Sequence, residues 1–227
     1  MSYEKEKMEK KIIIFLLFIG LLVSCNLEPF SIEKDSLIKN EMNQTQIIES
    51  TELFIYDVEN DRTVFSTNDK KYITSNGFTL LTTNKINTSE SFEEVESIIY
   101  KESGNQDAGY GVVFCEQEIV GERFLLCVMI NITGEYIVGK VNGCKFSPIS
   151  KWKSCVYLNK GYGVKNKLNI FFNEEEKIFK LKINNYRVEE FVVEDKFSFH
   201  NSRSGLVVVV SNREKFPEEA VRVLFER

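Results

Sequence analysis

The chain has 227 residues, of which 29 are lysine or arginine and 34 are aspartate or glutamate, giving a formal net charge of −5. It carries no basic tail and no run of five like charges. Nucleic-acid binding needs clustered lysines and arginines to neutralise phosphates, so we expect no nucleic-acid partner. A chain of this length suits one domain with a full hydrophobic core, or at most two small domains.

The N-terminus has the three parts of a secretory signal peptide. Residues 1–11 contain four lysines, residues 12–23 form an apolar run, and the small Ser24 precedes Cys25. A membrane-spanning helix is the weaker interpretation, because this run of twelve residues reaches about 18 Å across a hydrocarbon core of roughly 30 Å. We therefore expect residues 1–24 to be cleaved from the mature chain.

The segment Leu22-Val23-Ser24-Cys25 resembles the lipobox of bacterial lipoproteins. The resemblance implies a diacylglycerol on the Cys25 sulfur, cleavage just before this residue, and a membrane as its partner. One acyl chain binds a bilayer only marginally, whereas two or more hold firmly. We therefore expect a lipid-anchored protein of the cell envelope. In a host with two membranes, the lipoprotein pattern associates Asp after the lipidated cysteine with retention in the inner membrane. Asn26 stands there instead, so it is compatible with a location in the outer membrane or at the cell surface.

Residues 25–50 are rich in glutamate, lysine, asparagine, glutamine and serine, with only scattered isoleucines and leucines. This composition is typical of a flexible polar tether, whose ends would average about 25–30 Å apart. Over residues 51–227, short segments of β type alternate with polar turns, so we expect a single β domain there.

The first part of this domain contains runs of β-branched and aromatic residues separated by turn residues. We expect strands at residues 53–58, 62–66, 71–74, 78–82, 92–101, 110–115, 123–130 and 135–141. Asn142-Gly143 is the strongest two-residue hairpin signal in the chain.

The later part alternates apolar and polar residues more strictly. Strands at residues 168–172, 179–183 and 221–225 would each have one buried and one wet face, as in antiparallel sheets. Residues 206–210 are continuously apolar, which predicts a strand that is covered on both faces or lies beneath loops. Many short strands, without a long helical stretch or an internal repeat, predict an all-β, two-sheet antiparallel sandwich.

Several segments of the domain follow one another in a recognisable order. They are the glycine-rich strand Gly109–Phe114, the strand Gly134–Lys140, the lone Trp152 and a late hairpin. This order resembles the concanavalin A-like lectin and glucanase superfamily, in its laminin-G-like and keto-disaccharide-hydrolase-like branch. In the hairpin, Asn184-Asn185 replaces the family's Asn-Gly, and asparagine tolerates the positive φ that such a turn needs. The resemblance implies a jelly-roll fold.

Besides Cys25, the chain has Cys115, Cys127, Cys144 and Cys155. Four cysteines in an exported chain allow three disulfide pairings, and Cys144 with Cys155 is the pair best placed to bond. Cysteines inside apolar runs also behave as small hydrophobic residues, and we favour free thiols. No CxxC spacing occurs, so we expect neither a zinc site nor a redox site.

The sequence lacks the paired groups that glycoside hydrolysis needs. The strand motif E-x-D-x-x-E of the glucanases in this superfamily is absent. Glu190 and Glu194 would lie about 13 Å apart along a strand, against about 5 Å for a retaining pair. His200 is the only histidine, and no G-x-S-x-G elbow accompanies it. We therefore expect no enzymatic activity, with a divergent glycoside-processing enzyme as the alternative.

Exposed aromatic side chains are the remaining candidates for contact with a sugar. Tyr162 lies between two glycines, which is typical of an exposed loop, and Trp152 lies between two lysines. We therefore expect a non-enzymatic surface module that binds a glycan or a protein partner. Ca²⁺ is the one cofactor left open, because loop carboxylates and carbonyls bind it in lectin relatives, and Asp107 is the candidate ligand.

Overall fold

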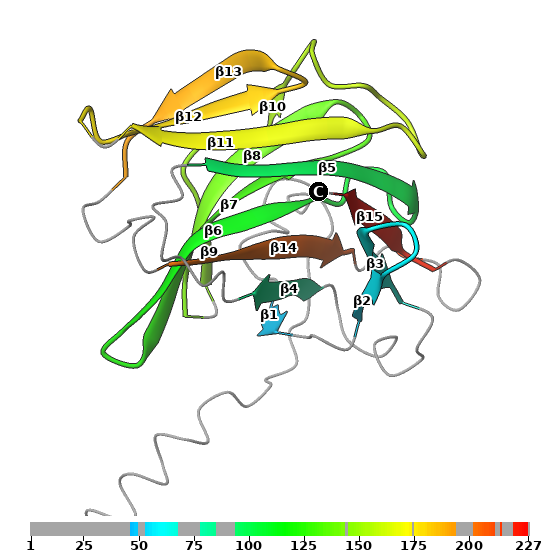
Figure 1. Ribbon diagram of the computed structural model, residues 1–227, viewed down its shortest axis with the longest axis horizontal. Coiled ribbons are helices and arrows are strands. Elements are labelled where there is room, and N and C mark those ends of the chain that lie inside the picture. The colour runs from blue at the N-terminus through cyan, green and yellow to red at the C-terminus, as the bar shows by residue number, and fades with distance from the viewer. Residues whose placement is uncertain are drawn as a thin grey trace, which may run out of the picture. The chain divides into compact units, whose positions relative to one another are not determined.

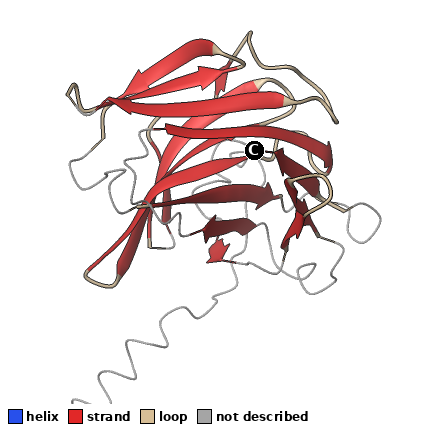
Figure 2. Ribbon diagram, viewed as in Figure 1, coloured by secondary structure: helices blue, strands red, loops and turns tan. Residues whose placement is uncertain are grey.

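Every regular element in the part of the chain that the computed structural model describes is a β-strand (Figure 2). The described residues are 46–49, 53–67, 78–84, 94–143, 145–173, 175–193, 202–211, 214 and 220–226. Some of the predicted features lie outside them: the signal peptide 1–24, Cys25, most of the tether, the strand at 71–74, Cys144, Glu194 and His200. No helix among the described residues is long and apolar enough to cross a membrane.

Eight described strands form the first sheet, sheet A, in the order β1-β4-β14-β6-β7-β8-β10, with β9 also paired to β8 (Figure 1). Their bounds are β1 Gln46–Glu49, β4 Phe78–Asn84, β6 Tyr110–Ile119, β7 Glu122–Ile130, β8 Glu135–Asn142, β9 Lys145–Pro148, β10 Lys153–Ser154 and β14 Arg203–Val210. All these pairings are antiparallel except the parallel pair of β1 with β4.

Seven described strands form the second sheet, sheet B, in the order β13-β12-β11-β5-β15-β3-β2, with every neighbouring pair antiparallel. Their bounds are β2 Phe54–Asp57, β3 Arg62–Ser66, β5 Glu94–Ser103, β11 Asn166–Asn173, β12 Ile178–Ile183, β13 Tyr186–Phe191 and β15 Arg222–Glu226. Strands distant in sequence lie side by side in both sheets, such as β14 between β4 and β6. The two sheets confirm the predicted antiparallel sandwich.

The expected strands that fall within the described residues are all present, and the differences are additions. β9 and β10 are too short for a pattern of alternation to mark them. β1 lies inside the segment that we expected to be tether, so sheet A begins at Gln46 rather than after residue 50. Ile47 and Ile48 are β-branched and suit a strand, and they align with Thr79 and Leu80 of β4.

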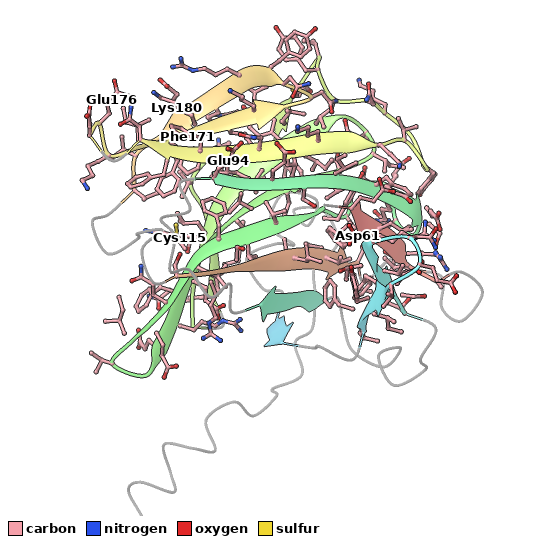
Figure 3. The ribbon with its side chains drawn as sticks, in the orientation of Figure 1. Asp61, Glu94, Cys115, Phe171, Glu176 and Lys180 are labelled. Atoms are coloured by element: carbon pink, nitrogen blue, oxygen red, sulfur yellow. The ribbon has the colours of Figure 1, made fainter. Side chains whose placement is uncertain are left out.

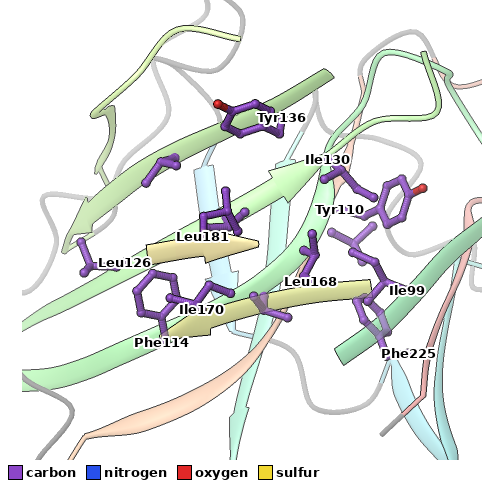
Figure 4. Close-up of a cluster of buried hydrophobic side chains, with 14 of the residues drawn as sticks. Ile99, Tyr110, Phe114, Leu126, Ile130, Tyr136, Leu168, Ile170, Leu181 and Phe225 are labelled. Atoms are coloured by element: carbon purple, nitrogen blue, oxygen red, sulfur yellow. The ribbon is translucent and has the colours of Figure 1, made fainter. Parts of the chain in front are cut away.

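The main core lies between the two sheets (Figure 4). Its residues are the alternate, inward-pointing side chains of each strand, such as Leu168, Ile170 and Phe172 of β11. Phe179 lies at the centre of a ring cluster, with centroid distances of 4.6 Å to Phe172, 5.3 Å to Phe191 and 5.6 Å to Phe114. Burial of each of these rings stabilises the fold by about 2–3 kcal/mol.

The central strands of sheet A, β6, β7, β8 and β14, are buried on both faces. Val208 and Val210 of β14 belong to the main core, whereas Val207 and Val209 belong to a second buried cluster with Leu125 and other side chains of β6, β7 and β8. The apolar run of β14 is continuous because both faces of this strand are buried, so it has no side in contact with water.

Sheet B has a polar outer face. Lys167 of β11 pairs with Glu96 of β5 at 2.9 Å, and Lys180 of β12 pairs with Glu176 at 2.9 Å. Figure 3 shows Glu176 and Lys180 together at one end of β12. Such exposed pairs contribute little to stability, in the range of about 0–1 kcal/mol each, so this face is a solvated surface.

Cys115, Cys127 and Cys155 are buried and free. Cys155 belongs to the main core, and its pairing with Cys144, which lies outside the described residues, stays a prediction. Burial raises the pKa of the Cys127 thiol to about 12 and raises that of Cys115 as well. Thiols that stay protonated are poor nucleophiles and poor metal ligands, so Cys115 and Cys127 are packing residues.

Candidate binding site at the end of the sandwich

One loop crosses an end of the sandwich and is fixed along its length. This end loop, residues 155–165, connects β10 to β11. Three backbone hydrogen bonds join it to neighbouring elements: Cys155 N–H to Gly134 O (2.9 Å), Gly161 N–H to Ile132 O (3.0 Å) and Gly163 N–H to Lys101 O (2.8 Å). The end loop is therefore attached to both the β7–β8 turn and β5, one from each sheet.

Two asparagine side chains, those of Asn166 and Asn184, join the end loop to the β12–β13 turn. The Asn166 side chain is 2% exposed and closes two bonds with the backbone of Asn159, at 2.8 and 2.9 Å. The Asn184 amide donates to the Asn166 side-chain oxygen (2.9 Å) and to the carbonyl of Tyr157 (2.7 Å). Because each side-chain amide has both donors and an acceptor, this cluster makes hydrogen bonds to several loop backbone groups that no neighbouring strand bonds.

The β12–β13 turn confirms the predicted hairpin. Asn184 and Asn185 both adopt positive φ, 50° and 71°, and Ile183 pairs directly with Tyr186 across a two-residue loop. Positive φ at both central positions is the geometry that matches the twist of the flanking strands. The turn places Tyr186 at the start of β13, which is the edge strand of sheet B.

Two tyrosines stack on each other in the open at this junction. The rings of Tyr157, from the end loop, and Tyr186, from the hairpin, are 4.3 Å apart between centroids and inclined by only 8°. The two residues are 41% and 56% exposed. We name this pair the tyrosine platform. Its rigid support and exposed ring surface are the two properties that a stacking site for a planar or ring-shaped ligand needs.

Tyr162 lies on the same end loop as Tyr157, as an exposed loop residue of the kind that we expected. It is 48% exposed, and its hydroxyl donates to the carbonyl of Gly104 in the β5–β6 loop. This bond fixes the ring against the sandwich and leaves part of its surface accessible. Its contact with a sugar stays a prediction.

Trp152 lies in a different environment. It is half-buried and packs against the second cluster, on the face of sheet A that points away from the main core. Its ring lies so close to Gly109 that a Cβ at that position would be 3.2 Å from the Trp152 Cη2 atom. The ring therefore has a packing partner, and a role in binding stays a prediction.

The β5–β6 loop is organised around a buried ammonium group. Lys101 Nζ donates to the carbonyl oxygens of Asn105 (2.6 Å) and Ala108 (3.4 Å). The Glu214 carboxylate accepts from the Asn105 N–H at 2.8 and 3.0 Å. Burial lowers the pKa of Lys101 from 10.5 to about 8, although the charges of Glu214 and Asp107 act in the opposite direction.

Asp107, the candidate calcium ligand, lies exposed in this loop, and its N–H donates to the Asn105 side-chain oxygen at 2.9 Å. Across the described part of the chain, no group of three or more histidine, cysteine, aspartate or glutamate side chains is arranged to hold a metal ion. Calcium binding at Asp107 stays a prediction.

The described carboxylates on strands near the site are held by cations. Glu189 of β13 pairs with Lys153 at 2.6 Å, and Glu190 pairs with Arg187. Burial and a hydrogen bond to Glu189 also raise the pKa of Tyr136. Glu189 and Glu190 thus have neutralising partners. Glu194, which we considered with Glu190 as a possible catalytic pair, lies outside the described residues.

Sequence reasoning missed both members of the tyrosine platform. Tyr157 lies between Val156 and Leu158, a context typical of a buried run, and Tyr186 begins a strand. The signal that could have marked Tyr186 is the Asn184-Asn185 turn, which puts the next residue at an exposed hairpin end. Nothing local marks Tyr157, because its exposure depends on how the end loop is attached.

No protein-family model matches the sequence, and no curated protein is similar to it. The structure is similar to a glycoside hydrolase family 16 endo-glucanase from Bacteroides ovatus bound to an oligosaccharide ligand, at 10% identity, with 82% of this chain and 89% of that chain covered and a TM-score of 0.51. A product complex of a mixed-linkage glucan family 16 enzyme from the same organism gives the same identity and coverage and a TM-score of 0.52.

The carbohydrate-binding module CBM66 from Bacillus subtilis is also similar, at 13% identity over 77% of this chain and 88% of that chain, with a TM-score of 0.43. At such identities the likeness defines the fold. This chain has a two-sheet jelly-roll sandwich, the fold that the resemblance of its sequence motifs implied.

Proposed function

We propose that this protein is a lipid-anchored envelope lipoprotein whose jelly-roll domain binds a saccharide without cleaving it. The observation that carries the proposal is the tyrosine platform, Tyr157 stacked on Tyr186 in the open. The C–H faces of a sugar ring stack on aromatic rings, and the tyrosine hydroxyls add hydrogen-bonding groups at the same place.

The fixed support of the platform favours binding. When a ligand binds to a mobile loop, the conformational entropy that the loop loses lowers the affinity. A loop that is already ordered avoids this entropic cost. The Asn184 amide holds the Tyr157 backbone at 2.7 Å, and the same side chain is part of the turn that carries Tyr186. Both rings are therefore placed by one hydrogen-bonded cluster before any ligand arrives.

The N-terminal sequence supports the membrane part of the proposal. Leu22-Val23-Ser24-Cys25 has the lipobox pattern, and a lipidated Cys25 would keep the domain at a membrane surface. Binding at such a surface needs no catalytic group, and the chain lacks the E-x-D-x-x-E motif. The fold itself serves both binding and hydrolysis, so the site and not the fold supports a binding role.

The test is a saccharide array followed by calorimetric titration of the retained saccharide with the full-length protein in detergent. Tyr157→Ala and Tyr186→Ala should each weaken binding by about tenfold, which corresponds to the loss of about 1.4 kcal/mol. Tyr56→Ala is the matched control, because Tyr56 is an exposed tyrosine on β2, at the opposite edge of sheet B. Equal affinity of all three variants and the parent would overturn the proposal.

The enzymatic alternative is tested on the same retained saccharide. Prolonged incubation with the protein should release no new reducing ends. Release that disappears when a carboxylate such as Glu189 is changed to glutamine would show a divergent glycoside-processing enzyme and replace the non-enzymatic part of the proposal.

A further inference from the structure

Positive charge is concentrated in the segment that carries the end loop. Residues 136–173 contain seven lysines and no aspartate or glutamate, in a chain whose net charge is −5. The lysines are Lys140, Lys145, Lys151, Lys153, Lys160, Lys165 and Lys167. Such a segregation creates a local field that attracts anions even though the whole protein repels them.

Part of this charge is neutralised from other strands, and part is left at the site. Lys165 pairs with Glu226 at 2.6 Å, as Lys153 does with Glu189. Lys160 lies on the end loop between Tyr157 and Tyr162, is exposed, and makes no ion pair with another described residue. Its alkyl chain covers Gly134, where a Cβ would be 2.5 Å from the Lys160 Cε atom. This packing holds the ammonium group beside the loop.

The hairpin that carries Tyr186 adds two more cations. Lys182 and Arg187 lie directly opposite each other in the β12–β13 register, one position along from the pair of Ile183 and Tyr186. Like charges directly opposite on neighbouring strands destabilise a sheet. Arg187 shares its charge with Glu190, whereas exposed Lys182 has no ion pair among the described residues. The pair is unfavourable for the fold alone, and an anionic ligand would relieve it.

We infer that the saccharide bound at the tyrosine platform is anionic and carries carboxylate or sulfate groups. This inference rests on the proposed function. The rings would take the face of a sugar, while Lys160, Lys182 and Arg187 would attract its acidic groups. Lys160 follows Tyr157 by three residues along the end loop, and Arg187, with Lys182 opposite it, directly follows Tyr186 in β13. Asn185, exposed in the turn, offers an amide to the same ligand.

The experiment compares matched probes by calorimetric titration of the full-length protein in detergent. One pair is an oligogalacturonate and the same oligosaccharide after carboxyl reduction, and the other is a heparin oligosaccharide and its desulfated form. We expect at least one anionic probe to bind about tenfold more tightly than its neutral counterpart at about 0.05 M salt. Raising the salt to about 0.5 M should remove most of this difference. The two pairs distinguish carboxylate from sulfate recognition.

Charge variants test the residues. Lys160→Gln and Lys182→Gln should each lower the affinity for the favoured anionic probe by about three- to tenfold. The affinity for its neutral counterpart should stay unchanged. Lys145→Gln is the control, since Lys145 is exposed on β9 of sheet A and belongs to the same acid-free segment. Neutral probes that bind as tightly as anionic ones, or lysine variants without effect, would overturn the anionic inference and leave the proposed function intact.

Loss of binding to every probe on this panel would overturn the anionic inference, while the saccharide array decides the proposed function separately. Binding that the Tyr157→Ala and Tyr186→Ala variants retain in full would overturn the proposed function, because the ligand would then lie elsewhere. Circular dichroism of each variant checks its folding, and substitution of exposed lysines should leave the spectrum unchanged.

Discussion

At the scale of single residues, Lys101 shows how one buried charge shapes the region beside the platform. Its ammonium satisfies the carbonyls of Asn105 and Ala108, which lack strand partners. A divalent cation at the nearby Asp107 would be repelled by this charge. The loop thus has an internal positive charge, offset in part by the carboxylates of Glu214 and Asp107, in the place where we considered Ca²⁺.

The same residue predicts a dependence of stability on pH. Burial lowers the pKa of Lys101 to about 8, against an ordinary value of 10.5 that we assign to the unfolded chain. Between these values the unfolded chain holds the proton more strongly, so folding releases it and stability gains with rising pH. Below about pH 8 both states are protonated and the cost of burying the charge is fully present.

Denaturant titrations at about pH 7 and pH 10 measure how the free energy of unfolding changes with pH. For Lys101→Met this free energy should rise less, or fall more, between the two pH values than it does for the parent. The gain in the parent is limited to about 1.4 kcal/mol for each unit by which the pKa is lowered. The comparison with the variant removes the contributions of tyrosines and cysteines that ionise in the same range. Parallel pH profiles for the two proteins would contradict the assignment.

At the scale of elements, the asparagine cluster is the feature that joins the end loop to the β12–β13 hairpin. Asn166→Ala would leave the backbone N–H and carbonyl of Asn159 without their partners, at 2.8 and 2.9 Å in the parent. We expect a loss of stability of about 1–3 kcal/mol and weaker binding of a platform ligand.

Thermal unfolding and ligand titration measure the two effects. Asn169→Ala is a suitable comparison, because Asn169 lies on the same strand β11 but bonds to Glu94 and Glu96 on the polar outer face. It should lose little stability and no affinity. If both variants behave alike, the cluster does not position the platform.

Strand patterning explains how much of the molecule could be predicted. Period-two alternation located β11, β12 and β15, because each buries one face, and the apolar run of β14 correctly predicted burial of both faces. The short β9 and β10 carry no pattern of that length. Tyr157 and Tyr186 come together through tertiary pairing of a loop with a hairpin, and a local pattern contains no information on such a contact.

At the scale of the whole molecule, the two sheets differ in a way that bears on function. The central strands of sheet A are buried on both faces, while sheet B has a polar outer face and ends at the edge strand β13, where Tyr186 lies. Arg187, Glu189 and Glu190 on this strand are charged, which hinders pairing with a strand of another chain. The edge is thereby kept open for a ligand of a different kind.

The lipid anchor is a prediction for the whole chain. In a bacterial host, the protein should incorporate labelled fatty acid and fractionate with membranes, since acylation of Cys25 is the anchor implied by the lipobox. Cys25→Ala should lose the label and appear in the soluble fraction, whereas Cys127→Ala, which changes a buried packing residue, should keep the label. Unchanged membrane association of the Cys25 variant would contradict the anchor.

The parallel pairing of β1 with β4 has a mechanical consequence for a protein held at Cys25. β1 is the first described strand of the chain and lies at the edge of sheet A, so tension applied from the N-terminal side reaches it before the core. Its ladder joins Gln46–Glu49 to Phe78–Leu81 and involves no strand of sheet B. If Cys25 is anchored as we propose, this short ladder would yield first under load and lengthen the connection to the anchor, while the end loop and its tyrosines would stay in place.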